Sequence, residues 1–397
     1  MASTLPTSSQ DTAASTVSNT GGGTALVMSG GGARAAYQVG FLRYLARELP
    51  ELKLPILTGV SAGAINAAYL AARPEPFATK AADLARHWQS LTVDQVFSVQ
   101  SLGLLGNVLR AGLKLVSGGA VAAPTPRSLV DTTPLWALVK RLCGSIDGSL
   151  PQIAKNIEAG ELRAIALTGA SYTSGRSVTW IEGRDVVPEE RAHRLSRPAR
   201  IGVQHVMASA ALPILFPAVR VDDAWFGDGG MRLTSPLAPA VHMGADRVLA
   251  ISTRYPRDYT REGSLVVEGY PPPAAVIGTV LNSVFLDLFD ADALRLERIN
   301  QLVRGLPEAE RGGLREVELL VLRPSQDLGR LANEYEARLP GMFRFLERGL
   351  GTREVKSNDL LSLVMFQPDY LTHLIELGEA DAQARHEEIA AFLSGSC

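Results

Sequence analysis

"ILTGVSAGAINAAYLAA", residues 56–72, places one serine, Ser61, between Gly59 and Gly63. The apolar residues 54–58 predict a short buried strand, because the run is too short for a helix. The alanine-rich residues 62–72 predict a helix, because alanine favours helical backbone and no proline interrupts the run. A serine on such a sharp strand-to-helix turn is a candidate nucleophile, and the turn accepts only small residues two places before and after it.

The predicted helix begins directly after Ser61. Its first N–H groups have no partner within the helix, and the helix dipole is positive at this end. Both features stabilise negative charge that develops near the serine. The pattern Gly-x-Ser-x-Gly has only three fixed positions, however, so a tight turn without chemistry remains the alternative.

A second glycine-rich segment, "GGGARAAYQVG" at 30–40, follows a strand predicted at 24–29. After it, apolar residues recur with helical spacing at Ala35, Val39, Leu42, Ala46 and Leu49. This spacing predicts a helix that packs one face inward. The order of strand, glycine loop, helix, strand, turn and helix predicts an α/β fold with a parallel sheet and helices on its faces.

The remaining pattern predicts one domain over 24–397, with a helical C-terminal part from about 325 to 397. Further strands are predicted at 162–170, 177–181, 247–253 and 317–323. Further helices are predicted at 77–90, 131–143, 276–304, 331–349 and 368–394. Residues 1–23 are rich in Ser and Thr and contain no Lys or Arg, which predicts a disordered tail and not a secretory or transit signal.

Composition excludes several classes of function. The 39 basic and 41 acidic residues give a net charge of −2, which argues against nucleic-acid binding. Two cysteines, Cys143 and Cys397, are too few for a disulfide framework and favour a reducing, cytoplasmic location. No uninterrupted apolar run reaches membrane-spanning length. The six histidines are scattered and no metal-ligand spacing occurs, so we expect neither a metal nor another cofactor.

The glycines Gly30, Gly31 and Gly32 allow two interpretations. A glycine loop that binds the phosphates of a dinucleotide needs glycine at position 35 and an acidic residue at the end of the next strand. This chain has Ala35 and no such acidic residue. An oxyanion hole needs backbone N–H groups that turn toward a reacting oxygen, which consecutive glycines permit. Loops that follow adjacent parallel strands meet at one edge of a sheet. The oxyanion hole is therefore favoured, and a nucleotide- or phosphate-binding scaffold is the alternative.

Three motifs occur in a fixed order along the chain: "GGGAR" at 30–34, "GVSAG" at 59–63 and "DGG" at 228–230. Taken alone, the last is a common turn. Together they resemble the patatin-like phospholipase family, and the similarity runs from about residue 24 to 253. The stretch 208–219 is similar to the segment that precedes the aspartate in that family. The resemblance implies a three-layer α/β/α sandwich with a mostly parallel central sheet, and acyl-ester hydrolysis without a metal.

The same resemblance implies roles for single residues. Ser61 is the implied nucleophile, and Asp228, followed by Gly229 and Gly230, is its base. The oxyanion donors would be Gly30, Gly31 and Gly32, with Arg34 bracing that loop. Ala35 departs from the family, which usually has glycine there, so the exit of the loop differs in this chain.

A Ser-His-Asp triad is not excluded by order alone, because His242, His373 and His386 follow Asp228. His242 lies in a predicted helix that leads to the far end of the next strand, and the other two lie on polar helical faces. We therefore expect Asp228 to act directly, with apolar neighbours Trp225 and Phe226 raising its pKa by desolvation.

The expected activity is that of a lipolytic serine acyl hydrolase, of phospholipase A or carboxylesterase type, acting on a lipid or another acyl ester. An acyltransferase is a further alternative. Residues 101–119 hold many Leu and Val residues, two cations and no acid. They fit either a mobile lid in peripheral contact with a membrane or a helix packed on the core. The head group, the acyl chain length and the oligomeric state stay open.

Overall fold

The computed structural model describes residues 23–98, 128–256, 276, 278–280, 287–336 and 358–395. The predicted tail up to residue 22, the segment 101–119 and Cys397 lie outside these residues. None of the described helices combines the length and the apolar character that crossing a membrane requires.

The described strands form one ten-stranded sheet, and its central part is parallel. The parallel strands, in spatial order, are β10 (Glu318–Leu322), β9 (Arg247–Ile251), β1 (Thr24–Met28), β2 (Ile56–Gly59) and β3 (Ala164–Ser171). Beyond β3 follow β4 (Ser177–Gly183), β6 (Arg194–Pro198) and β5 (Glu189–Glu190), and the hairpin of β7 (Val219–Val221) and β8 (Ala224–Asp228) pairs with β3. The predicted mostly parallel sheet is confirmed.

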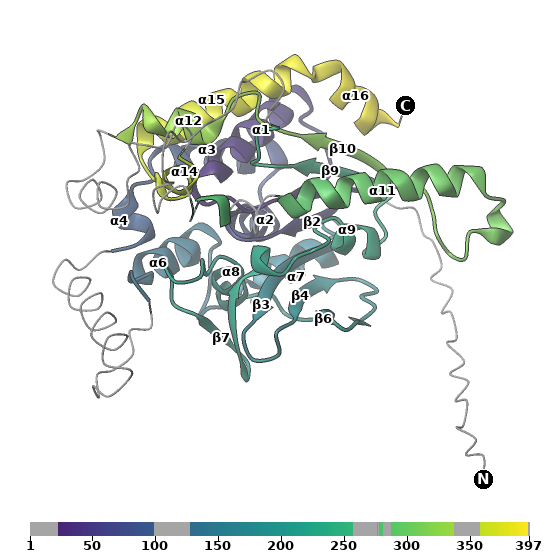
Figure 1. The fold of residues 1–397 in the computed structure, drawn as a ribbon, viewed down its shortest axis with the longest axis horizontal. Coiled ribbons are helices and arrows are strands. Elements are labelled where there is room, and N and C mark those ends of the chain that lie inside the picture. The colour runs from purple at the N-terminus through teal and green to yellow at the C-terminus, as the bar shows by residue number, and fades with distance from the viewer. Residues whose placement is uncertain are drawn as a thin grey trace, which may run out of the picture.

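Helices cover both faces of the sheet (Figure 1). One face carries α1 (Ala35–Glu48), α2 (Ala62–Ala71), α3 (Phe77–Gln89) and α15 (Pro368–Ala384); the other carries α9 (Ala238–His242) and α11 (Asp287–Gly305). Alternate residues of β1 serve the two layers, since Leu26 and Met28 join the first core and Ala25 and Val27 join the second. The three-layer α/β/α sandwich expected from the sequence is therefore present.

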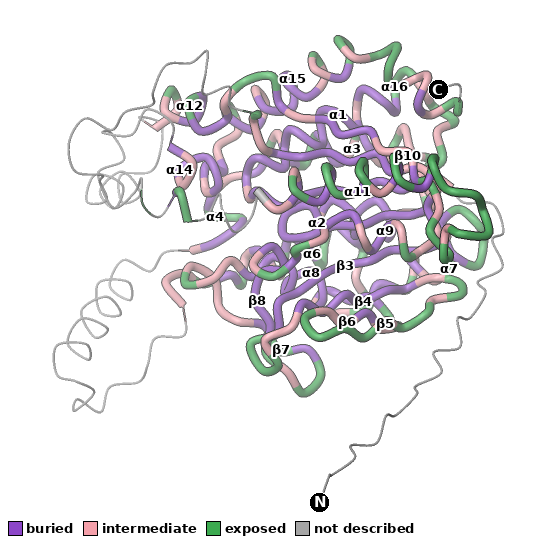
Figure 2. Tube along the Cα trace, turned by 45° about the vertical axis from the view of Figure 1, so that its right-hand side comes forward, coloured by how far each residue is buried: buried purple, intermediate pink, exposed green. Residues whose placement is uncertain are grey.

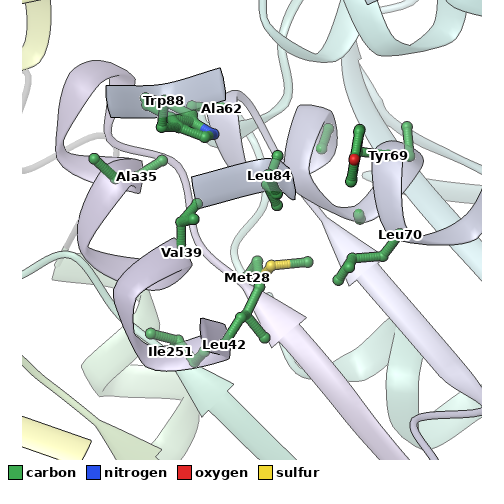
Figure 3. Packing of buried hydrophobic residues seen from close by; sticks show 14 of the residues in the cluster. Met28, Ala35, Val39, Leu42, Ala62, Tyr69, Leu70, Leu84, Trp88 and Ile251 are labelled. Atoms are coloured by element: carbon green, nitrogen blue, oxygen red, sulfur yellow. The ribbon is translucent and has the colours of Figure 1, made fainter. Parts of the chain in front are cut away.

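The larger core lies between the sheet and α1, α2 and α3. Figure 3 shows Met28 and Ile251 from neighbouring strands packed with Val39 and Leu42 of α1. The outer side of α1 is covered in turn by α15, so this helix is buried along most of its length (Figure 2). The strand ends that carry the glycine loop and Ser61 are thus anchored in the best-packed part of the molecule.

Several predicted boundaries were wrong. The helix predicted to start at 331 begins earlier, as α12 (Leu328–Asn333), because the Asp327 side chain caps it by accepting from the N–H groups of Gly329 and Arg330. Residues 337–349 lie outside the described chain. The helix predicted at 368–394 breaks at Arg385 into α15 and α16 (His386–Ser394).

The helix predicted at 131–143 is present as α6 (Thr133–Leu142). It begins only after Asp131, because Asp131 pairs with Ser98 in an isolated bridge. Other elements were not predicted at all. Sequence patterns also missed α4 (Val93–Val96), α7 (Pro151–Glu158), α8 (Val203–Ser209), α14 (Asp359–Val364) and strands β5 to β8. These elements are too short to show a clear hydrophobic period, so tertiary contacts determine where they form.

Candidate active site

Ser61 lies between the end of β2 and the first residue of α2, with φ 56° and ψ −130°. This backbone conformation is rare for a residue with a side chain and is typical of strained functional turns. A Cβ on Gly59 would overlap the carbonyl group of Gly63, and a Cβ on Gly63 would overlap the carbonyls of Met28 and Ser29. The sharp turn predicted from the glycine spacing is present, and close backbone approach is its physical reason.

The glycine loop runs alongside Ser61 because β1 and β2 are neighbours in the sheet. A Cβ on Gly30 would lie 2.9 Å from the Cβ of Ser61. Gly31 and Gly32 have φ angles of 148° and 55°, which other residues rarely adopt. No group in the described chain accepts a hydrogen bond from the N–H of either residue. With the first N–H of α2, at Ala62, they form a group of available donors beside the serine.

Gly30 differs from the other two glycines of the loop. Its carbonyl oxygen accepts a 2.6 Å hydrogen bond from Oγ1 of Thr253, and it does not line the pocket that Gly31, Gly32 and Ser61 share. Gly30 therefore holds the loop against the end of β9, whereas Gly31 and Gly32 present their backbone to the pocket.

Arg34 anchors the glycine loop through hydrogen bonds to a helix that is distant in sequence. Its side chain is only 3% exposed. Its Nε donates to Oγ of Ser362 at 2.7 Å, and its Nη2 donates to Oδ1 of Asp359 at 2.7 Å. Both partners belong to α14, whose Leu363 carbonyl would collide with a Cβ on Gly32. A helix more than 300 residues away in the chain thus packs directly on the loop.

A buried series of three hydrogen bonds links helices α3, α2 and α1 to the same loop. The Trp88 indole donates to Asn66 Oδ1 at 2.9 Å, and Asn66 Nδ2 donates to Gln38 Oε1 at 3.1 Å. The Gln38 Nε2 then donates to the carbonyl of Ser29 at 2.8 Å. Because Trp88 also lines the pocket, these three hydrogen bonds connect the pocket wall to Ser29, the residue that precedes the glycines.

Asp228 ends β8, which runs antiparallel to β3 and places this residue opposite Gly169. The carboxyl group is fully buried. Its Oδ1 accepts from the N–H of Gly230 at 2.9 Å, whereas its Oδ2 is buried without a hydrogen-bond partner in the described chain. Burial raises the pKa of Asp228 to about 7, and hydrogen bonding from Ser61 and Gly230 opposes that rise.

The Ser61 hydroxyl thus lies near enough to lower the pKa of the Asp228 carboxyl, while Oδ2 of Asp228 has no hydrogen-bond partner among the described residues. Catalytic hydrogen bonds are commonly long before substrate binds and shorten in the complex. A buried carboxylate with one free oxygen beside a strained serine is the arrangement that a general base requires.

The surroundings of Asp228 differ in part from expectation. Phe226 is buried and lies on the same side of β8 as Asp228, but Trp225 points to the opposite side and is 48% exposed. The expectation that Trp225 desolvates the carboxyl was wrong, because successive residues of a strand face opposite ways.

The three histidines that follow Asp228 in the chain have other partners. His242, at the end of α9, lies 3.0 Å from Nη2 of Arg194. His373 pairs with the hydroxyl of Tyr335 at 2.8 Å, and His386 pairs with that of Tyr44 at 3.2 Å. Within the described residues, no histidine is hydrogen-bonded to Ser61 or Asp228.

Ser209, which sequence reasoning did not single out, contacts the strained serine directly. Its hydroxyl accepts from the N–H of Ser61 at 3.1 Å and donates to the carbonyl of Thr168 at 2.6 Å. Two residues on, the Ala211 carbonyl accepts from the N–H of Asp228 at 2.8 Å. The only hint in the sequence was the family-like stretch 208–219, which says nothing about which residue touches Ser61.

A mostly apolar pocket opens beside Ser61. Its walls come from α2, α3, α4, α6, α14 and the loop before β7, with apolar side chains from Ile65, Trp88, Leu91, Val96, Leu135, Leu138, Leu142, Leu212, Phe216, Leu363, Val364 and Phe366. Such a pocket suits a hydrocarbon chain better than a phosphate. In the described chain, no group of three His, Cys, Asp or Glu side chains is placed to hold a metal ion.

Comparison with known proteins bears on this arrangement. A family model for "Patatin-like phospholipase" matches residues 26–241, more than half of the chain. No curated protein matches in sequence. Among solved structures, the chain is similar to human GIVD cytosolic phospholipase A2 (15% identity, TM-score 0.46), with 94% of this chain and 59% of that one covered. It is also similar to VipD from Legionella pneumophila (13%, TM-score 0.32, 89% and 67% covered). The chain thus spans about three fifths of the length of the human phospholipase.

Proposed function

The chain belongs to the patatin-like phospholipase family, and from this we propose that it is a lipolytic serine acyl hydrolase that works through Ser61 and Asp228. The observation that supports this proposal best is the buried Asp228 carboxyl, with one unpartnered oxygen, beside a serine on a strained turn. The apolar pocket that starts at Ser61 provides room for the acyl chain of the ester.

The proposed reaction has two halves. Oγ of Ser61 attacks the ester carbonyl carbon, and its proton passes to Oδ2 of Asp228. The N–H groups of Gly31, Gly32 and Ala62 stabilise the oxyanion that forms. The carbon–oxygen bond to the alcohol then breaks, the alcohol leaves with the proton from Asp228, and an acyl-enzyme remains.

Water completes the cycle. It attacks the acyl-enzyme carbonyl and gives a proton to Asp228, and the second tetrahedral intermediate breaks down to free acid while Ser61 regains its proton. If an alcohol replaces water at this step, the same site performs acyl transfer. Product analysis with and without an added alcohol distinguishes the two reactions.

A fluorophosphonate probe tests the nucleophile. We expect the folded wild-type protein to be labelled once, with the added mass on the peptide that contains Ser61, and the Ser61→Ala variant to resist labelling. Labelling at another residue, or equal labelling of the variant, would contradict the assignment. A panel of nitrophenyl esters, triglyceride, phospholipid and lysophospholipid then determines the substrate class.

A further inference from the structure

The apolar pocket has a polar end away from Ser61. Ser61 caps α2, and Tyr69 lies eight residues further along this helix, which corresponds to about 12 Å at the usual helical rise. The ring of Tyr69 packs edge to face on that of His87, with the centroids 6.1 Å apart. His87 lines the pocket, so the pocket extends roughly two helical turns from the serine.

Helix α6 also lines the pocket and carries a charged residue in its last turn. Its start is tied to the loop near Ser61, because the N–H of Val130 donates to the carbonyl of Leu215 at 3.1 Å. Leu135 and Leu138 then line the pocket, and Arg141 follows in the last turn. From Leu135 to Arg141 the rise is about 9 Å. Burial lowers the pKa of His87 and the charge of Arg141 lowers it further, so these two pocket residues lie close together.

Within the part of the chain that the structure describes, Arg141 has no carboxylate partner at this end of the pocket. Neighbouring cations have their own carboxylates, since Arg73 pairs with Glu75 at 2.8 Å and Arg86 pairs with Asp83. The Arg141 side chain forms no hydrogen bond or ion pair with any residue that the structure describes, although it lines the pocket and reaches solvent. A pocket with mostly apolar walls thus also carries a guanidinium group that has no counterion among the described residues.

We propose that the pocket accepts esters in which an anionic group, carboxylate or phosphate, lies about 12 Å from the scissile carbonyl, and that Arg141 selects this group. The proposal rests on the proposed function, because it assumes that Ser61 is the reacting atom. The anionic group has two sources. It is the far end of the acyl chain, as in the half-ester of a dicarboxylic acid, or it belongs to the alcohol.

Two pairs of esters distinguish these sources. Nitrophenyl half-esters of linear dicarboxylic acids of increasing length are compared with their methyl-capped counterparts, which lack the charge. Lysophosphatidate is compared with the monoacylglycerol that has the same acyl chain. We expect a preference for the charged member of one pair and, on the acyl side, a maximum at the chain length that reaches Arg141.

The Arg141→Gln variant should lose this preference, with kcat/KM for the charged ester falling about five- to tenfold and that for the neutral ester changing less than about twofold. Arg141→Lys should retain most of the preference. Lys140→Gln is the matched control, because it removes the same charge from the neighbouring exposed residue, which does not line the pocket.

Each outcome decides one of the two proposals. Hydrolysis of neutral esters without preference for charge, or a preference that survives in Arg141→Gln, would overturn the role of Arg141 and leave the hydrolase intact. If the folded wild-type protein cleaves no ester of either kind, the proposed function fails and this inference fails with it. Melting temperatures confirm that the variants are folded.

Discussion

The backbone N–H of Ser61 donates a 3.1 Å hydrogen bond to the hydroxyl of Ser209, a residue 148 positions away in the chain. The same hydroxyl donates to the carbonyl of Thr168 in β3. Since the Ala211 carbonyl accepts from the N–H of Asp228, residues 209–211 contact both the proposed nucleophile and the proposed base. This short segment therefore sets the distance between the two groups.

Replacing Ser209 by alanine should reduce turnover more than it reduces substrate affinity. The change leaves the N–H of Ser61 and the carbonyl of Thr168 buried without partners, which costs about 1–3 kcal/mol for each group. We expect kcat to fall about tenfold or more, with KM within about twofold, because the strained turn loses its position and not its pocket.

Ser177→Ala is the control for Ser209→Ala. Its hydroxyl is also buried, but it has no hydrogen-bond partner in the described chain, so its removal should change neither kcat nor the melting temperature appreciably. An unchanged kcat in Ser209→Ala, or equal effects in the two variants, would show that Ser209 does not position the serine.

Asp228→Asn should inactivate the protein without unfolding it. The amide cannot accept the serine proton, so we expect a loss of about ten-thousandfold or more in kcat, close to that of Ser61→Ala. Single alanine variants of His242, His373 and His386 should stay within a few-fold of wild type, because each histidine is bonded elsewhere. A folded histidine variant as inactive as Ser61→Ala would replace the dyad with a triad.

The pH dependence of kcat/KM should report the buried carboxyl group. Because the pKa of Asp228 is raised to about 7, the base is protonated in mild acid and activity should rise with pH to a plateau above that value. A profile governed by an ordinary carboxyl pKa, with full activity at pH 5, would argue against Asp228 as the base.

The raised pKa of Asp228 should also make the stability of the fold depend on pH, and stability should fall over the pH range in which activity rises. The folded state binds the Asp228 proton more tightly than the unfolded state, whose pKa is near 3.8, so stability falls as pH rises from about 4 through 7. The full separation corresponds to at most about 4 kcal/mol. Denaturant titrations should therefore show Asp228→Asn gaining stability over wild type at pH 8 and little or none at pH 4.

Gly31→Ala should weaken stabilisation of the oxyanion. With φ at 148° and Oγ1 of Thr253 only 2.5 Å from the new Cβ, the loop must shift and its N–H must turn. Losing one such donor costs about 3 kcal/mol of barrier, or roughly a hundredfold in kcat. Gly160→Ala is the control. Its φ of 78° is also positive and unfavourable for alanine, but a Cβ there would meet no other atom and the residue does not line the pocket. Equal turnover in both variants would leave Gly31 with a purely structural role.

Arg34→Ala should destabilise the fold because it removes the buried member of an ion pair. Removing the guanidinium leaves Asp359, whose side chain is 11% exposed, without its 2.7 Å ion pair, which costs about 3 kcal/mol or more. The double variant Arg34→Ala/Asp359→Ala should lose less than the sum of the single variants in a denaturant double-mutant cycle. Arg220→Ala, which removes an exposed cation, should have no measurable effect. Additive losses would show that the pair is not coupled.

The sequence by itself determined the features that depend on neighbouring residues. The glycines beside Ser61, the strand before it and the alanine-rich helix after it are contiguous, and sterics alone restrict the turn that they form. The same reasoning predicted that the two loops meet, because adjacent parallel strands end at one edge of a sheet. The parallel sheet with helices on its faces followed from the alternation of strands and helices, and the three-layer sandwich was implied by the family resemblance.

Only the tertiary structure decided what holds those residues in place. Arg34 was expected to brace the glycine loop, but its partners Asp359 and Ser362 lie in a six-residue helix without a recognisable pattern. The proposed roles of Ser209 and Arg141 likewise depend on elements that meet in space and are far apart in the chain. Local sequence restricts backbone angles over a few residues, whereas a hydrogen bond or a pocket wall depends on which distant segments packing brings together. The residues of the proposed site could therefore be named from the sequence, whereas the contacts that hold them in place could not.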